Sequence, residues 1–132
     1  MTNFTTDMNS RSSTLTIRMR GYFQTEQFSD LFEDSLKDIQ NGKPLIVLLD
    51  ARFIKSGWMS ANPWLVSWFL PKIALLKVKH FGVIIEEDCD PFTRFSVINL
   101  ESLLENEPSL KINLFESPEE AVIWGRDLLK AA

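Results

Sequence analysis

The chain contains one histidine and one cysteine, which limits the chemistry that its side chains could perform. His80 comes directly before the apolar run from Phe81 to Glu86, and Cys89 follows the end of that run. If the run is a strand, a rise of about 3.3 Å per residue places the two side chains roughly 20 Å apart. A Cys–His catalytic pair and a zinc site are therefore not expected, and we predict that the protein is not an enzyme.

Acidic residues follow two apolar runs and are the remaining candidates for a metal or acid–base site. Asp50 ends one run, and Glu86, Glu87, Asp88 and Asp90 end or follow the next. Open parallel sheets bind ligands at such strand ends, but acids there are more often solvated loop residues. The five glycines are too scattered to form a phosphate-binding loop. We predict no cofactor and no metal, with a divalent-ion site as the minor alternative.

The whole composition fits one globular domain of 132 residues, of which 45% are hydrophobic. Fourteen basic and eighteen acidic residues give a net charge of -4, which argues against nucleic acid as a partner. A single cysteine cannot form an intramolecular disulfide and fits a reducing compartment. We find neither a signal segment nor an apolar run of about eighteen residues, so we expect a cytoplasmic protein.

Residues 51–85 differ from the rest because they contain five basic residues and no acidic one. Three of the four tryptophans lie in the same window. On a helix that begins at Pro63, one ridge holds Trp64, Trp68 and Leu75, and a second holds Leu65, Phe69, Ile73 and Leu76. Lys72 and Lys79 project between the ridges, and Pro71 should kink the helix. One ridge can cover a sheet, which leaves the other for a pocket, a partner or a membrane.

A simpler interpretation of this window is a buried helix, because tryptophans at helical spacing are usually core residues. Its lysines could still reach water along their aliphatic stems. The charge pattern does not decide between the two interpretations.

The remaining pattern predicts strands and helices in alternation. Residues 15–20 alternate as a half-buried strand, a helix begins at Thr25 and stops at Asn41–Gly42, and two continuous apolar runs, 45–50 and 81–86, indicate central parallel strands. A helix from Asp90–Pro91 to about Glu107, an edge strand over 110–114 and a helix capped by Ser117 complete the pattern.

Four strand–helix units of this kind predict an α/β fold, with a small, mostly parallel sheet of four to five strands and flanking helices. Residues 1–13 are polar and lack periodicity, so we interpret them as a flexible arm with at most one short edge strand. Residues 14–132 are expected to form a single domain.

The order of segments resembles SpoIIAA-like proteins of the STAS-like fold over roughly Leu15 to Leu129. LIVLLDARF runs into IKSGWMSANP, FGVIIE follows, and an edge strand closes on FESPEEAVIWGRDLL. The most specific parts are the Ser56–Gly57–Trp58 turn and the ending from Phe115 to Trp124. The resemblance implies a small sheet with flanking helices, no enzymatic activity, and a relation to lipid-carrying CRAL-TRIO domains.

Anti-sigma-factor antagonists of the wider fold carry a regulatory serine, phosphorylated within an Asp-Ser-Ser-Gly stretch. The matching region here is Lys55-Ser56-Gly57, so only Ser56 and Gly57 agree with that pattern. A lysine replaces the preceding acid, and the bulky Trp58 follows. Ser56 is the candidate regulatory residue, and a purely turn-forming serine is the alternative.

Our leading hypothesis is non-enzymatic binding of an apolar or amphipathic, lipid-like ligand between the tryptophan helix and the sheet. Peripheral association with the inner membrane is part of this hypothesis. The candidate ligand- or membrane-binding residues are Trp58, Met59, Trp64, Trp68, Phe69, Lys72, Leu75 and Lys79. The alternatives are a protein-interaction module of the anti-sigma-factor-antagonist type, regulated by phosphorylation at Ser56, and a homodimer that uses the same apolar ridge.

Overall fold

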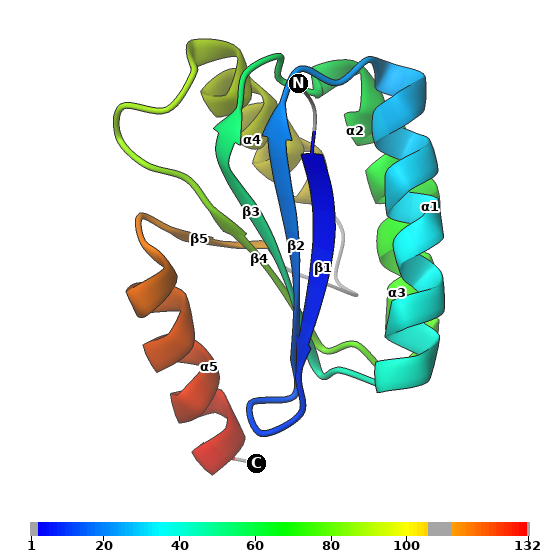
Figure 1. The fold of residues 1–132 in the computed structure, drawn as a ribbon, viewed down its shortest axis with the longest axis vertical. Coiled ribbons are helices and arrows are strands. Elements are labelled where there is room, and N and C mark those ends of the chain that lie inside the picture. Colours follow the sequence, from blue (N-terminus) through cyan, green and yellow to red (C-terminus); the bar gives the residue numbers. More distant parts are fainter. Residues whose placement is uncertain (1–2, 106–111, 132) are drawn as a thin grey trace.

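A sheet of five strands forms the centre of the protein in a computed structural model that describes residues 3–105 and 112–131. The strands are β1 (Asn3–Asn9), β2 (Thr14–Gly21), β3 (Ile46–Ile54), β4 (His80–Ile84) and β5 (Ile112–Phe115). They lie side by side in chain order, with β1 antiparallel to β2 and all other neighbours parallel (Figure 1). This arrangement confirms the predicted α/β fold with a mostly parallel sheet.

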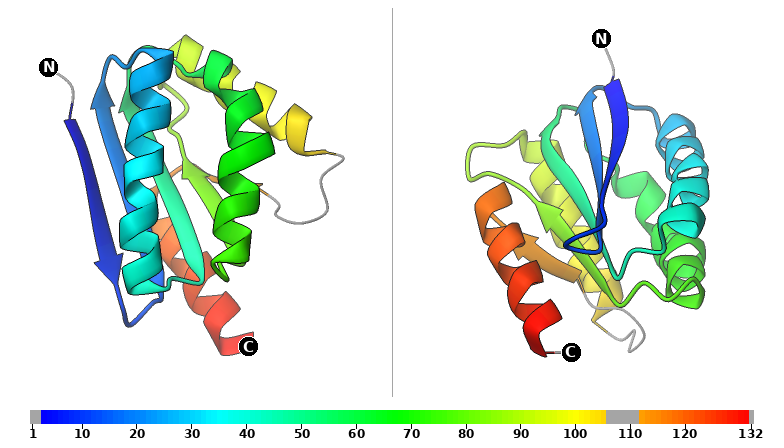
Figure 2. Two further views of the ribbon diagram at one scale, coloured as in Figure 1. Left: turned by 90° about the vertical axis from the view of Figure 1, so that its right-hand side faces the viewer. Right: turned by 60° about the horizontal axis from the view of Figure 1, so that its bottom comes forward.

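Helices cover the two faces of the sheet unequally. One face carries α1 (Thr25–Gly42), the irregular helical segment from Met59 to Leu75, and α4 (Pro91–Leu104), while α5 (Pro118–Ala131) lies on the other face (Figure 2). The main core lies under the first three. A smaller cluster under α5 contains Ile46, Leu48, Ile84, Phe115 and Ala121. α5 covers its face of the sheet mainly over β4 and β5. On the same face, β1 and β2 therefore stay polar and open to solvent.

The N-terminal segment, which we interpreted as a flexible arm with at most one short edge strand, contains the edge strand β1. β1 pairs with β2 from Asn3 to Asn9, and its inward residues Phe4 and Met8 pack against the main core. The hydroxyl of Thr6 also donates to the carboxylate of Asp38 on α1, at 2.8 Å. Two apolar side chains are too few to reveal a strand by periodicity, but pairing with β2 supplies the backbone hydrogen bonds that fix it.

The aromatic segment is helical without interruption from Asn62 to Leu75, close to the predicted start at Pro63, but its hydrogen-bonding pattern changes along the way. A 3₁₀ turn over Met59–Ala61 leads into α2 (Asn62–Trp64), a π-helical turn over Leu65–Phe69, and α3 (Leu70–Leu75). The π-helical turn ends two residues before Pro71, whose nitrogen carries no hydrogen to donate to an α-helical ladder. The two predicted ridges persist across this turn: Leu65, Phe69 and Ile73 are buried, whereas Trp64 and Trp68 are half-buried and Leu75 is exposed.

Local capping signals set the starts of α4 and α5 as predicted, whereas α1 begins at Thr25 with Gln24 and not Thr25 as its N-cap. The Asp90 carboxylate accepts the Phe92 N–H at 2.9 Å, and the Ser117 hydroxyl accepts the Glu120 N–H at 3.2 Å. α1 runs through Gly42 and ends with Lys43 in the left-handed region at a φ of 50°. The predicted end of α4 at Glu107 and the predicted strand residues 110–111 lie outside the described residues.

Candidate functional site

A groove lies at the carboxyl ends of β2 and β3, between the first turns of α1 and α4. Its volume is about 570 Å³. Three chain segments line it: the β2–α1 connection, the turn after β3, and the start of α4. The lining residues are Phe23, Gln24, Thr25, Ser56, Gly57, Trp58, Met59, Ser60, Phe92, Phe95 and Ser96. The groove therefore contains the Ser56–Gly57–Trp58 turn that the sequence singled out.

Close backbone packing against α4 explains why this turn contains glycine. Gly57 has a φ of +68°, and a Cβ atom built there would lie 2.6 Å from the carbonyl oxygen of Phe92. The Trp58 N–H donates to the Ser96 hydroxyl at 2.7 Å, and that hydroxyl donates to the same Phe92 carbonyl at 2.7 Å. The turn is thus held against the first turn of α4, which gives the groove a fixed wall.

Ser56 connects the turn to the loop before α1. Its hydroxyl oxygen accepts the Phe23 N–H at 2.9 Å, and its hydroxyl group can donate to the Phe23 carbonyl at 3.2 Å or to the Gly57 carbonyl at 3.1 Å. The side chain is half-buried. The regulatory candidate is therefore engaged in a hydrogen-bonded clamp at the floor of the groove.

Large apolar side chains are exposed beside the groove. The exposed fractions are 46% for Met59, 66% for Phe92, 56% for Phe95 and 54% for Ile98. The three residues of α4 follow one another at intervals of three and share the outer side of the helix, since Val97 and Leu100 are buried in the core. We call Met59, Phe92, Phe95 and Ile98 the apolar rim. Of these four, only Met59 was among the candidates from the sequence.

Two of the predicted ligand-binding aromatic residues are core residues in the structure. Trp58 is 3% exposed and stacks on Phe28, with ring centroids 5.4 Å apart. Phe69 is fully buried and meets Phe32 edge-on at 5.0 Å. With Leu65 and Ile73 also buried in this core, side chains fill the space between the tryptophan segment and the sheet. The structure thus gives no support to a lipid pocket at that place.

The other candidates of the tryptophan segment gather on the surface, away from the groove lining. Trp64 and Trp68 are half-buried and stack on each other at 5.2 Å, and the Lys72 ammonium lies 5.4 Å from the Trp68 ring centroid. Leu75 is 79% exposed, and Lys79 is exposed as well. None of these five residues lines the groove. The structure therefore separates the predicted set into core, groove and outer surface.

The candidates for metal or acid–base chemistry are dispersed or paired. Asp50 is 4% exposed and is bound by the Arg52 guanidinium, which also lies 3.5 Å from Glu86. His80 packs edge-on against Trp124, and Cys89 is half-buried after β4. Within residues 3–105 and 112–131, no group of three or more histidine, cysteine or acidic side chains could hold a metal ion. None of the helices in these ranges is long and apolar enough to span a membrane.

Two solved structures share this architecture over nearly their whole length. An anti-sigma factor antagonist from Mycobacterium paratuberculosis has a TM-score of 0.61 and 16% sequence identity, with 96% of each chain covered. A protein of the DUF3478 family from Shewanella loihica PV-4, described as having a SpoIIAA-like fold, has a TM-score of 0.54 and 13% identity, with 93% of this chain and 92% of that chain covered. No family model and no curated protein matches the sequence.

These likenesses show that the chain has the SpoIIAA-like fold of STAS-like proteins, as the sequence resemblance indicated. Identities of 13–16% carry the fold alone. Neither description mentions a lipid or a membrane, so the predicted lipid binding, membrane association and relation to CRAL-TRIO domains gain no support from them.

Proposed function

We propose that the protein is a non-enzymatic protein-interaction module of the anti-sigma-factor-antagonist type, whose partner is a regulatory protein. The structural likeness to an anti-sigma factor antagonist over 96% of both chains supports this class of function. We place the docking surface at the groove and the apolar rim, that is, Met59, Phe92, Phe95 and Ile98.

The exposure of the apolar rim is the observation that carries the proposal. A phenylalanine removes about 150–250 Å² from water when it is buried, so leaving Phe92 and Phe95 more than half exposed gives up stabilisation. Exposed apolar side chains that lie next to a concave surface are typical of protein-binding sites. Aromatic anchors of this kind contribute most of the affinity in many interfaces.

The groove also has a backbone that needs little ordering before a partner binds. The Trp58 N–H and the Ser96 hydroxyl tie the turn to α4, and Ser56 ties it to the loop at Phe23. A preformed surface avoids part of the entropy cost of association. The same hydrogen bonds make the shape of the groove sensitive to a chemical change at Ser56.

Phosphorylation of Ser56 is the regulatory part of the proposal. The hydroxyl now accepts the Phe23 N–H and can donate to the Phe23 carbonyl. A phosphoester oxygen has no hydrogen to donate, and the added negative charge would face the carbonyl oxygens of Phe23 and Gly57. Modification would therefore open the clamp, shift the loop before α1 and change the groove that the partner contacts.

Affinity capture with matched variants tests the docking surface. The wild-type chain is compared with a Phe92→Ser/Phe95→Ser variant and with a Val122→Ser/Ile123→Ser control, which changes two α5 residues that are each 56% exposed. We expect the wild type and the control to retain the same partner and the rim variant to lose it. Equal capture by all three chains would contradict the proposed surface.

Ser56→Asp and the exposed control Ser10→Asp test the regulation separately. We expect Ser56→Asp to weaken the affinity for the captured partner by roughly tenfold, by analogy with the loss of a buried hydrogen bond. We expect Ser10→Asp to leave that affinity unchanged. If Ser56→Asp has no effect, the regulatory part fails while the docking surface stands. A native mass spectrum that shows a homodimer disrupted by the rim variant would instead assign this face to a second copy of the chain.

A further inference from the structure

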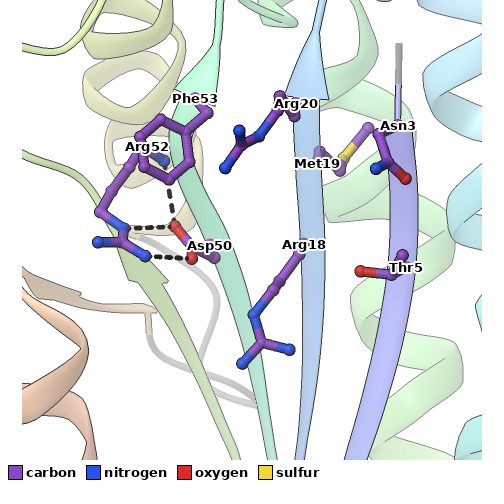
Figure 3. Close-up of a pocket in the computed structure, with 8 residues that line it drawn as sticks. All are labelled: Asn3, Thr5, Arg18, Met19, Arg20, Asp50, Arg52 and Phe53. Carbon is purple, nitrogen blue, oxygen red and sulfur yellow. Dashed lines mark hydrogen bonds and ion pairs between the residues drawn. The ribbon is translucent and has the colours of Figure 1, made fainter.

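A second pocket lies on the sheet face that α5 leaves open. It has a volume of about 300 Å³ and is lined by residues of β1, β2 and β3, which are Asn3, Thr5, Arg18, Met19, Arg20, Asp50, Arg52 and Phe53. Figure 3 shows the arginines extending from β2 and β3 in front of the sheet. A volume of this size is at the lower end of those that hold small molecules. In a chain with a net charge of -4, three arginines in one pocket are an unusual local excess of positive charge.

Strand register places the lining residues in two rows across the sheet. Asn3 pairs with Arg20, and Arg20 pairs with Phe53. Thr5 pairs with Arg18, and Arg18 pairs with Asp50. The register shifts between these rows, because β3 has an extra residue opposite β2. This bulge brings Phe53 to the same side of the sheet as Arg20, since side chains of a regular strand would alternate.

Asp50 is the acidic group inside the pocket, and Arg52 neutralises it. The two carboxylate oxygens accept from Nε of Arg52 at 2.9 Å and from Nη2 of Arg52 at 2.8 Å. This bidentate pair raises the pKa of Arg52, chiefly through its hydrogen bond to Asp50. Glu86 adds a looser contact with Arg52 at 3.5 Å. Because Arg52 neutralises the carboxylate, Asp50 repels an anion in the pocket only weakly.

Arg20 is held by an aromatic ring and not by a carboxylate. Its guanidinium carbon lies 4.5 Å from the centroid of Phe53, and the guanidinium of Arg52 lies 4.9 Å from the same ring. Within the part of the chain that the structure describes, Arg20 takes part in no ion pair. A cation over a ring face keeps its N–H groups available for another acceptor. Arg20 is thus positioned but electrostatically unpaired.

Arg18 is the second cation, and its present partner is weakly held. Its guanidinium lies 3.5 Å from the Asp7 carboxylate, and both side chains are more than half exposed. Ion pairs of this kind exchange readily with other anions in water. On β1, Asn3 and Thr5 lie beside the two arginines of β2. Their side chains offer an amide and a hydroxyl group as neutral hydrogen-bond donors.

We propose that this pocket binds the oxyanion group of a small molecule, a phosphate or a carboxylate, with Arg20 as the main ligand-binding residue. Arg18, Asn3 and Thr5 complete the set of donors, and Phe53 orients Arg20. The Asp50–Arg52 pair keeps the floor of the pocket neutral. The site lies on the opposite side of the sheet from α4, so it is separate from the proposed docking surface.

A backbone NMR titration of the full chain tests the site, with inorganic phosphate and citrate as probes at constant ionic strength set by sodium chloride. We expect saturable shifts at Asn3, Thr5, Arg18 and Arg20 with at least one probe, and the tighter probe identifies the class of oxyanion. The loss of one charge-assisted hydrogen-bonding group predicts that Arg20→Gln weakens binding roughly tenfold. The control Arg11→Gln removes the same charge from the β1–β2 turn and should change affinity by less than about twofold.

Arg20→Lys serves as a second variant, because it keeps the charge but loses the planar donor geometry. We expect it to bind more weakly than the wild type and more tightly than Arg20→Gln. Absence of saturable shifts with both probes would overturn the proposal. Equal weakening by Arg11→Gln and Arg20→Gln would also overturn it, because it would show a general charge effect.

Discussion

The backbone N–H of Trp58 donates to the hydroxyl of Ser96 at 2.7 Å across 38 positions of sequence. This bond joins the turn after β3 to the first turns of α4. The Ser96 hydroxyl in turn donates a hydrogen bond to the Phe92 carbonyl. The groove wall and the exposed phenylalanines are therefore one hydrogen-bonded unit. Changes at the turn should be felt on the face that we assign to a partner.

Gly57→Ala should destabilise the protein by about 2 kcal/mol or more, because an alanine at a φ of +68° is strained and its Cβ would meet the Phe92 carbonyl oxygen at 2.6 Å. Urea unfolding followed by circular dichroism measures the change. Gly125→Ala is the matched control, since its Cβ would meet only the end of the Ile46 side chain at 3.3 Å. We expect the control to be neutral or to gain up to about 1 kcal/mol from helix propensity. Equal losses in both variants would contradict the close packing at Gly57.

Asn62→Ala should cost about 2 kcal/mol of unfolding free energy. The fully buried Asn62 amide donates to the Ser96 carbonyl at 2.8 Å and to the side chain of the half-buried Asn99 at 2.9 Å, so its removal takes a hydrogen-bond donor from both acceptors. Asn62→Asp should cost more, because it places a carboxylate oxygen against those acceptors. The exposed Asn41→Ala in α1 should cost nothing in the same urea experiment. A harmless Asn62→Ala would show that these bonds do not hold α2 to α4.

Because of His80, we predict that the protein loses stability as the pH falls below about 6.5, which is the pKa of this side chain in the unfolded chain. Burial, and to a smaller extent the charge of Lys79, lowers the pKa of His80 in the folded protein. Between the folded and unfolded pKa values, the unfolded chain binds the proton more strongly, so this stabilisation is complete above the unfolded value and declines as the pH decreases. Urea midpoints at about pH 8 and about pH 5.5 should therefore differ more for the wild type than for His80→Gln.

An identical pH dependence in these two proteins would exclude a contribution from His80. Lys79→Gln provides an intermediate case, because it removes the smaller of the two causes. We expect its stability to decline less than that of the wild type over the same range of pH.

Local signals in the sequence predicted most of the fold. Continuous apolar runs marked β3 and β4 as central strands, and the caps at Asp90 and Ser117 marked two helix starts. These signals depend on residues close together in the chain. For β1 the sequence allowed a short edge strand but did not give its bounds, because they depend on pairing with β2 and on a contact with α1.

The site was harder to predict, because its residues are defined by what their neighbours cover. The apolar arc of α4 gives no indication that Val97 is buried while Phe92 and Phe95 stay exposed. Trp58, which was expected to contact a ligand, lines the groove and also stacks on Phe28 of α1, which is far from it in the sequence. The charge of the window 51–85 was also hard to interpret from the sequence. The window contains no acidic residue, but Asp50 and Glu86 lie just outside its two ends and both contact Arg52.

Hydrogen exchange on the complex with the captured partner tests the central claim most directly. The account predicts slower exchange, relative to the free chain, in residues 56–60 and 92–98, with unchanged exchange in α5 over residues 118–131. The Phe92→Ser/Phe95→Ser variant, mixed with the same partner, should show no such protection. Protection confined to α5, or to the Trp64–Trp68 surface, would contradict the assignment of the groove and the apolar rim as the docking surface.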